Sequence, residues 1–326
     1  QNNFNNALRL MAHRGPDNHG VLDVDNILLG HRRLSIIDIS SDSNMPFEDK
    51  DENLIITYNG EIYNYIEIKK LLIDKGYSFK TESDTEVILK AYVEWGESCL
   101  KRFNGMFAFF IYDTLKKKGF GARDRFGVKP FYYHSSNDKF IFSSEIKPIL
   151  ELGVKPTTNI EYLRTYIVNS ALDYGSGTLI NEINQIEAGQ YFTIQNNKIS
   201  FTKWWKNDDL IVELPESYED RIEMYRSTLS DSVKIRLRSD VNSAITLSGG
   251  MDSTSIYSLY KKNHYNDSSE IKPLDIFTIK YGEESGIDEV EDVKKITSSF
   301  GDSFNSIQID SSDALSKLRE TIYFQE

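Results

Sequence analysis

Cysteine is almost absent from this sequence of 326 residues, which holds Cys99 as its one thiol. A disulfide within the chain is therefore excluded, because it would need two cysteines. Histidine is also scarce, and the 5 histidines show no spacing typical of metal ligands, such as His-Glu-x-x-His. The sequence consequently predicts no structural metal.

Basic residues and long apolar runs are the next shortages. Lys and Arg number 38 against 50 Asp and Glu, which gives a formal net charge of −12 and argues against a nucleic-acid surface. No apolar run approaches the length of a membrane span, and residues 1–10 lack the charged-then-apolar pattern of a secretion signal. We therefore expect a cytoplasmic protein without nucleic-acid or membrane partners.

Two domains are expected, because the chain exceeds the length of one typical domain and its 39% hydrophobic content can build two cores. Residues 1–205 form the first, residues 206–216 an acidic, irregular linker and residues 217–326 the second. The first domain reads as a layered α+β fold. Its expected strands are residues 26–30, 34–38, 54–58, 107–113, 119–123, 131–134, 139–143, 189–193 and 198–202, and its expected helices are residues 66–75 and 85–95.

The second domain alternates the two element types. Strands are expected at residues 244–247, 274–281 and 304–309, and helices at residues 218–238, 253–262, 288–300 and 313–324. Strict alternation of strand and helix indicates a parallel, doubly wound α/β sheet.

The strongest chemical motif is the segment Leu247–Ser253, which joins an expected strand to a helix through a glycine turn. Gly249 and Gly250 let the backbone approach a phosphate closely, and the first helical N–H groups have no partner within the helix. Ser248 and Ser253 add hydroxyl donors. The segment thus predicts an anion site.

Asp252 lies in the same turn, where a carboxylate would repel a pyrophosphate unless a divalent cation lay between them. We therefore expect Asp252 to bind Mg²⁺ through oxygen. The alternative is that Asp252 and Ser253 merely cap a helix. The motif resembles the Ser-Gly-Gly-x-Asp-Ser signature of ATP pyrophosphatases, which cleave ATP to AMP and pyrophosphate while activating a carboxylate.

Three clusters in the first half suit an amino acid as ligand. Arg32 and Arg33 offer guanidinium groups, whose planar fork matches a carboxylate. The segment Asn59–Glu61 combines an amide and a glycine N–H, which an oxyanion hole needs, with an acid for an ammonium group. Asp84 supplies a second acid at a helix start. Each cluster also has a purely structural interpretation. Arg32 and Arg33 could belong to an ion-paired surface strand, Asn59-Gly60 could form a type I′ turn, and Asp84 could be a helix N-cap.

Six segments in a fixed order resemble glutamine-hydrolysing asparagine synthetases: residues 14–17, 31–38, 58–64, 83–86, 104–109 and 122–130. They precede the 247–253 loop as in that family. The resemblance implies an αββα sandwich of the N-terminal-nucleophile glutaminase type, with Asn59 and Gly60 as its oxyanion hole. It implies that glutamine is bound by Arg33, Leu34, Ser35, Ile36, Ile37, Asn59, Gly60, Glu61 and Asp84. It implies that ATP is bound by Leu247, Ser248, Gly249, Gly250, Asp252, Ser253 and Ile279.

Two departures from the family accompany this resemblance. Family members carry an N-terminal Cys as nucleophile, with its own amine as base, whereas this sequence starts beyond that point. Cys99 is expected to be a buried small residue that cannot replace it. The family's later Ser-Gly-Glu-Gly-x-Asp-Glu loop, which helps to hold pyrophosphate, is also missing. We therefore expect the sequence to be incomplete at both ends.

The expected activity of the complete protein is glutamine-dependent asparagine synthesis. Glutamine would be hydrolysed in the first domain, and its ammonia would attack an aspartate carboxylate adenylated by Mg-ATP in the second, with release of AMP and pyrophosphate. One alternative is a related amidotransferase whose acceptor is a sugar-acid, antibiotic or peptide carboxylate. Another is a non-catalytic regulatory relative. A homodimer is left open.

Overall fold

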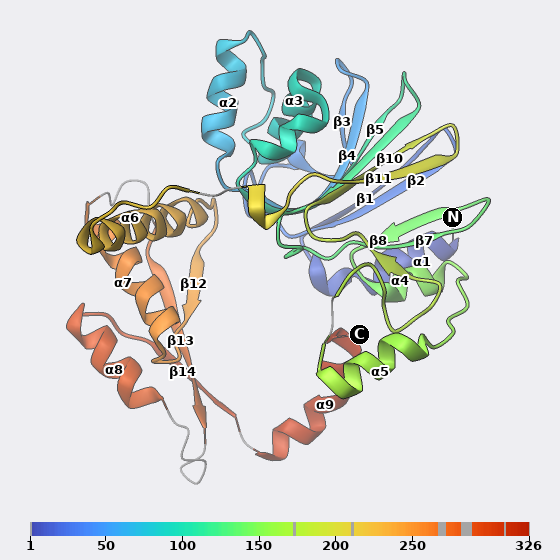
Figure 1. Cartoon of the computed structure of the whole chain (residues 1–326). Helices are drawn as coiled ribbons and strands as arrows, with labels where there is room; N and C mark the ends of the chain where they lie inside the picture. Colours follow the sequence, from blue (N-terminus) through green and yellow to red (C-terminus); the bar gives the residue numbers. More distant parts are fainter. Residues whose placement is uncertain are drawn as a thin grey trace. The chain divides into compact units, whose positions relative to one another are not determined.

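The computed structural model describes residues 2–171, 174–209, 212–266, 272–281, 289–309 and 311–325. The chain forms two compact units, Gln1–Ile211 and Val212–Glu326 (Figure 1). Within the described part of the expected linker, residues 207–209 form one short 3-10 helix. Among the described helices, none has both the length and the apolar character needed to cross a lipid bilayer.

A six-stranded antiparallel sheet lies at the centre of unit 1, in the order β11-β10-β6-β5-β4-β3. Its strands are β3 (Phe47–Asp49), β4 (Leu54–Ile62), β5 (Gly105–Asp113), β6 (Lys118–Arg123), β10 (Gln190–Gln195) and β11 (Lys198–Lys203). Helices α2 (Tyr65–Asp74) and α3 (Asp84–Trp95) cover one face (Figure 1). Leu72, Ile88 and Phe107 are fully buried in the core between these helices and the sheet.

A second layer covers the other face of this sheet. It consists of the hairpin β1 (Asn18–Val24) and β2 (Ile27–Arg33), and of a sheet in the order β8-β7-β9, with β7 (Tyr132–Ser135), β8 (Phe140–Ser143) and β9 (Asn184–Gln185). Leu29, Phe110 and Phe192 are buried between the layers. Helices α1 (Asn2–Leu10) and α4 (Ile146–Glu151) contact the outer side of β2 and β8, and α5 (Ile160–Asn169) follows. Unit 1 is therefore an αββα sandwich, as predicted.

Two local predictions in unit 1 are wrong. Residues 34–38 form a loop instead of a strand, because Asp38 has a φ of 49° and its carboxylate accepts hydrogen bonds from the Ser43 hydroxyl and the Glu82 N–H. These polar contacts replace a strand ladder. The second error is the end of strand β4, which continues to Ile62 instead of ending at Tyr58. Gly60 pairs with Phe107 of β5, so Asn59-Gly60 does not form the type I′ turn that was considered.

Gly60 is expected to be essential for the stability of unit 1. A Cβ atom at this position would overlap the Met106 carbonyl oxygen and lie 2.7 Å from the Phe107 Cα, at a φ of 153°. Because backbone atoms cannot swing away, Gly60→Ala should lower the free energy of unfolding by about 2–4 kcal/mol. Gly76 is a matched control, since its φ is 97° and its Cβ position has nothing within 4 Å.

Urea unfolding of the two variants measures this difference. Gly76→Ala should cost about 1 kcal/mol, which is the backbone strain alone. Equal losses in both variants would show that close packing at Gly60 carries no extra cost.

Unit 2 contains the parallel sheet β12-β13-β14, formed by β12 (Ser243–Thr246), β13 (Leu274–Tyr281) and β14 (Asn305–Ile309). Its helices are α6 (Tyr218–Arg236), α7 (Met251–Asn266), α8 (Val290–Ser299) and α9 (Ser311–Gln325). Ser217 caps α6 by accepting the Asp220 N–H. Val233, Tyr257 and Ile276 are buried in one core. The predicted doubly wound α/β arrangement is confirmed.

Candidate functional site

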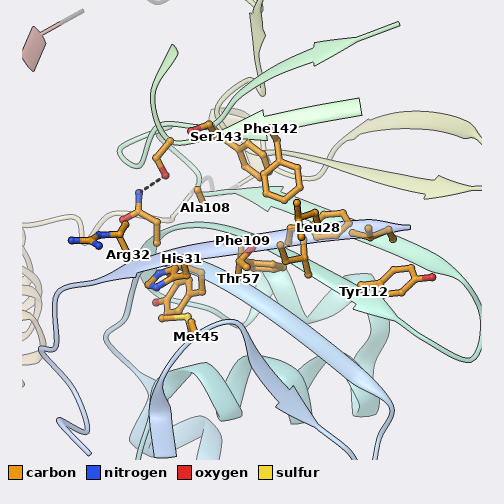
Figure 2. Close-up of a pocket in the computed structure, with 18 of the residues that line it drawn as sticks. Leu28, His31, Arg32, Met45, Thr57, Ala108, Phe109, Tyr112, Phe142 and Ser143 are labelled. Atoms are coloured by element: carbon orange, nitrogen blue, oxygen red, sulfur yellow. Dashed lines mark hydrogen bonds between the residues drawn. The ribbon is translucent and has the colours of Figure 1, made fainter. Parts of the chain in front are cut away.

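A cavity of about 1490 Å³ opens within unit 1, lined by residues that include parts of β2, β4 and β8. Figure 2 shows His31 and Arg32 at one end of the cavity, with Leu28 and Tyr112 toward the other and Phe142 and Ser143 across from them. The end near Tyr112 is also polar, because Tyr112 and Lys117 both donate hydrogen bonds to the Asp25 carboxylate there.

Strand β4 presents Asn59, Gly60 and Glu61 to this cavity. The Asn59 amide nitrogen donates to the Ser144 hydroxyl at 3.4 Å, a long hydrogen bond (the dashed line in Figure 2). Because this bond is weak, the amide is available to another acceptor. The strand thus holds a donor where a developing oxyanion could be stabilised.

Asp84 reaches the cavity from the first turn of α3. The N-cap is Ser83, whose hydroxyl accepts the Thr85 N–H at 3.0 Å, so the alternative that Asp84 is the cap is wrong. The Asp84 Oδ2 atom accepts the Tyr58 hydroxyl at 2.8 Å and the Ile62 N–H at 2.9 Å. Burial nevertheless raises the pKa of Asp84 to about 6, because a carboxylate loses hydration there.

Glu61 is the second acid in the cavity. Its pKa is raised to about 6 by burial and by the negative charge of Asp84, while Lys129 acts in the opposite direction. Two carboxylates that share a cavity favour a cationic ligand, since an ammonium group would relieve their repulsion. The negative charge of these carboxylates is what the ammonium group of an amino acid requires.

Arg33 has a different environment from the one predicted. One of its Nη groups donates to the Ser40 carbonyl at 2.7 Å and the Asn44 Oδ1 at 2.8 Å. The other donates to the carbonyls of Ile37 and Asp38. The guanidinium thus fastens the loop that follows β2. A ligand carboxylate would have to share these N–H groups or displace a loop oxygen.

The remaining predicted glutamine positions divide into two groups. Leu34, Ile36 and Ile37 line the cavity, whereas Ser35 is not among its lining residues and donates its N–H to Asp17 at 2.8 Å. Cys99 lies fully buried in the core on the other face of the central sheet, and burial raises the pKa of its thiol. The interpretation of Cys99 as a buried small residue is confirmed.

Sequence reasoning assigned no role to Lys129, which also lines the cavity. Its backbone is fixed on both sides, because its N–H donates to Asp124 at 3.0 Å and its carbonyl accepts from Arg123 at 2.7 Å. Both partners are buried. Residues 122–130 were part of the family resemblance, and this was the one available signal for Lys129.

In unit 2 the 247–253 segment forms a turn between β12 and α7, as predicted. Gly249 has a φ of 72°, and the Ser253 hydroxyl bridges the Ser248 N–H and the Gly250 carbonyl, each at 3.3 Å. Leu247 is buried, and its N–H donates to the Phe277 carbonyl at 2.8 Å. Ile279 lies two residues further along β13 and is 40% exposed. The turn and Ile279 thus lie toward the carboxyl ends of parallel strands, where α/β sheets bind ligands.

Asp252 is exposed in the first turn of α7. Among the described residues there is no group of three or more His, Cys, Asp or Glu side chains that could hold a metal ion. Asp252 alone fits Mg²⁺ only as one oxygen ligand, which is how this ion binds when phosphates and water complete its coordination.

Comparison with known proteins decides the family. A sequence profile described as a glutamine amidotransferase domain matches residues 1–205, and one described as asparagine synthase matches residues 224–326. The chain belongs to the glutamine-hydrolysing asparagine synthetase family. Asparagine synthetase [glutamine-hydrolyzing] 1 of Bacillus subtilis is 36% identical over 294 residues, which cover 90% of this chain and 45% of that protein.

Two further relatives cover nearly all of the chain. Asparagine synthetase [glutamine-hydrolyzing] 3 of Bacillus subtilis is 31% identical over 97% of this chain and 53% of its own length. Amidase chyE of Penicillium rubens is 30% identical over 98% of this chain and 48% of its own length. The chain therefore spans about half the length of these family members, and both domain types fall within that half.

Proposed function

We propose that the protein containing this chain is a glutamine-dependent asparagine synthetase. The observation that carries the proposal is the cavity of unit 1, where Asn59, Gly60, Glu61 and Asp84 converge within a glutamine amidotransferase domain. We assign residues 1–205 to the glutaminase domain, 206–216 to the linker and 217–326 to the ATP-pyrophosphatase domain. As in the family, an N-terminal Cys outside this sequence would be the nucleophile.

Each part of glutamine has a proposed partner in the cavity. Glu61 and Asp84 receive the ammonium, and Arg33, with the loop 34–37, receives the carboxylate. The side-chain carbonyl of glutamine lies against the Asn59 amide and Gly60. When the nucleophile adds to that carbonyl, its oxygen gains negative charge, which the Asn59 N–H stabilises more strongly than the neutral ground state.

The second half of the proposal concerns ATP, the acceptor carboxylate and unit 2. Leu247 and Ile279 contact the adenosine, while Ser248, Gly249, Gly250 and Ser253 offer backbone and hydroxyl donors to the phosphates. Mg²⁺, held in part by Asp252, supplies positive charge that offsets the charge of the phosphates. The proposed acceptor is aspartate, whose adenylate would react with ammonia.

Aspartate-dependent release of pyrophosphate from ATP tests the ATP site in the native full-length protein. Asp252→Asn should weaken Mg-ATP binding roughly ten- to hundredfold, because it removes the charged metal ligand. Asp275→Asn makes the same charge change at the exposed amino end of β13 and should leave pyrophosphate release unchanged. Unaltered release by Asp252→Asn would contradict the assigned role.

A second acceptor class is favoured by the relative named as an amidase, since its 30% identity is close to that of the synthetases. In that case the ammonia and ATP chemistry is retained, and the acceptor is another carboxylate. The same pyrophosphate assay distinguishes the two classes. Release that depends on aspartate supports the synthetase, whereas release that needs a sugar-acid or peptide carboxylate supports the other amidotransferase.

A further inference from the structure

Tyr58 is held at both ends in the interior of unit 1. Its carbonyl lies 2.9 Å from the His31 Nε2 atom, and its hydroxyl donates to the Asp84 carboxylate at 2.8 Å. A carbonyl can only accept, so Nε2 of His31 carries a proton and donates it to this bond. Burial lowers the pKa of His31 to about 4, so the imidazole is neutral at pH 7. Tyr58 is 3% exposed, so water does not compete for these bonds.

Asp84 bonds the two residues that border the segment Asn59–Glu61 in the sequence, Tyr58 and Ile62. The same Oδ2 atom accepts the Tyr58 hydroxyl from one side of the segment and the Ile62 N–H from the other, at 2.8 and 2.9 Å. The carboxylate is therefore fastened to strand β4 at two points. This arrangement fixes Asp84 relative to Asn59 and Gly60, although it belongs to a different element, helix α3.

We propose that Tyr58 is a positioning residue for glutamine recognition, whose hydroxyl fixes one oxygen of Asp84 and so directs the carboxylate at the substrate ammonium. The inference rests on the proposed glutaminase function. The proposed role belongs to the hydroxyl oxygen of Tyr58 alone. The ring packs in the apolar core that includes Ile62 and Phe109, as a phenylalanine ring would. The hydroxyl is what distinguishes a positioning role from a packing role.

Because Asp84 is surrounded by other charged groups, loss of the Tyr58 hydroxyl should change the pKa of Asp84 measurably. Glu61 on β4 is a nearby negative charge, Arg33 at the end of β2 is a nearby positive charge, and Lys129 faces Glu61. The Tyr58 hydroxyl is the side-chain donor to the Asp84 carboxylate, beside the backbone N–H groups of Ile62, Thr85 and Asp84 itself. Without it the ionised form loses a charge-assisted hydrogen bond in a buried place, and the pKa of Asp84 rises above about 6.

The pH dependence of kcat/KM for glutamine in the native full-length protein tests this role. In the wild type the acid limb of the kcat/KM profile should lie near pH 6, because Asp84 and Glu61 must both be ionised to bind the ammonium and the pKa of each is raised to about 6. Tyr58→Phe should move that limb upward by about one to two pH units. The loss of activity should therefore be large at pH 6.5 and small above pH 8.5.

Tyr112→Phe is the matched control. Tyr112 is also a buried tyrosine that donates to an aspartate, Asp25, at 3.2 Å, but it lies away from His31 and Arg32 in the cavity (Figure 2). The acid limb of the kcat/KM profile of Tyr112→Phe should match that of the wild type. The inference would be overturned if the acid limb of Tyr58→Phe stayed at the wild-type pH, or if this variant lost kcat/KM equally at every pH. A wild type that hydrolyses no glutamine would overturn the proposed function, and with it the role of Tyr58.

Discussion

Asn59→Ala in the native full-length protein should lower kcat for glutamine hydrolysis by about 10²–10³, with little change in KM. The expected loss falls on kcat because the Asn59 amide acts on charge that develops only in the tetrahedral intermediate. The fold should tolerate the change, since the described contact of this amide is one 3.4 Å hydrogen bond to Ser144. Steady-state glutaminase kinetics measure the effect.

Ser144→Ala is the control for this prediction. It removes the hydroxyl that the Asn59 amide contacts, without removing the amide itself. Its kcat should stay close to the wild-type value. A comparable fall in both variants would mean that the Asn59–Ser144 contact organises the cavity, and that Asn59 does not stabilise an oxyanion.

Asp84→Asn should lower kcat/KM for glutamine roughly thirty- to a thousandfold, which corresponds to about 2–4 kcal/mol. The asparagine side chain keeps the size of aspartate and an oxygen that can accept from Tyr58 and Ile62, so packing is preserved. What it loses is the negative charge for the substrate ammonium, and its amide NH₂ group repels that cation.

Glu86→Gln provides the comparison, because Glu86 is a buried carboxylate in the same helical turn that accepts the N–H groups of Lys80 and Thr81. It does not line the cavity. This variant should lose stability without a specific loss in kcat/KM for glutamine. If both variants lose kcat/KM to the same extent, Asp84 supports the fold and does not bind the substrate.

The strand, glycine turn and helix around residues 247–253 could be predicted from sequence because their determinants are local. An apolar strand, two glycines and a helix start lie consecutively in the chain, and the structure forms β12, the turn and α7 there. The strand predicted at residues 34–38 failed because the apolar pattern Leu34, Ile36 and Ile37 also suits a loop. Arg33 and Asp38 bind that loop through contacts that no local pattern encodes.

The same reason explains why Tyr58 and Lys129 were missed. Tyr58 meets Asp84 across 26 positions in the chain, and Lys129, in the loop between β6 and β7, lines the same cavity as Glu61 of β4. The predicted residues Asn59, Gly60, Glu61 and Asp84 do converge, although the first three were expected to follow a strand end at Tyr58, whereas β4 continues to Ile62. Family resemblance identified the segments, and only the fold showed which atoms meet.

Comparison of glutamine with ammonium as nitrogen donor tests the central claim most directly. In the native full-length protein, Asn59→Ala and Asp84→Asn should both lose glutamine-dependent synthesis and retain ammonia-dependent synthesis close to the wild-type rate. This result is expected because the cavity residues act on glutamine in unit 1, while ammonia enters the reaction after that step. Equal losses with both donors would contradict the account, since they would show that these residues maintain the structure and do not recognise glutamine.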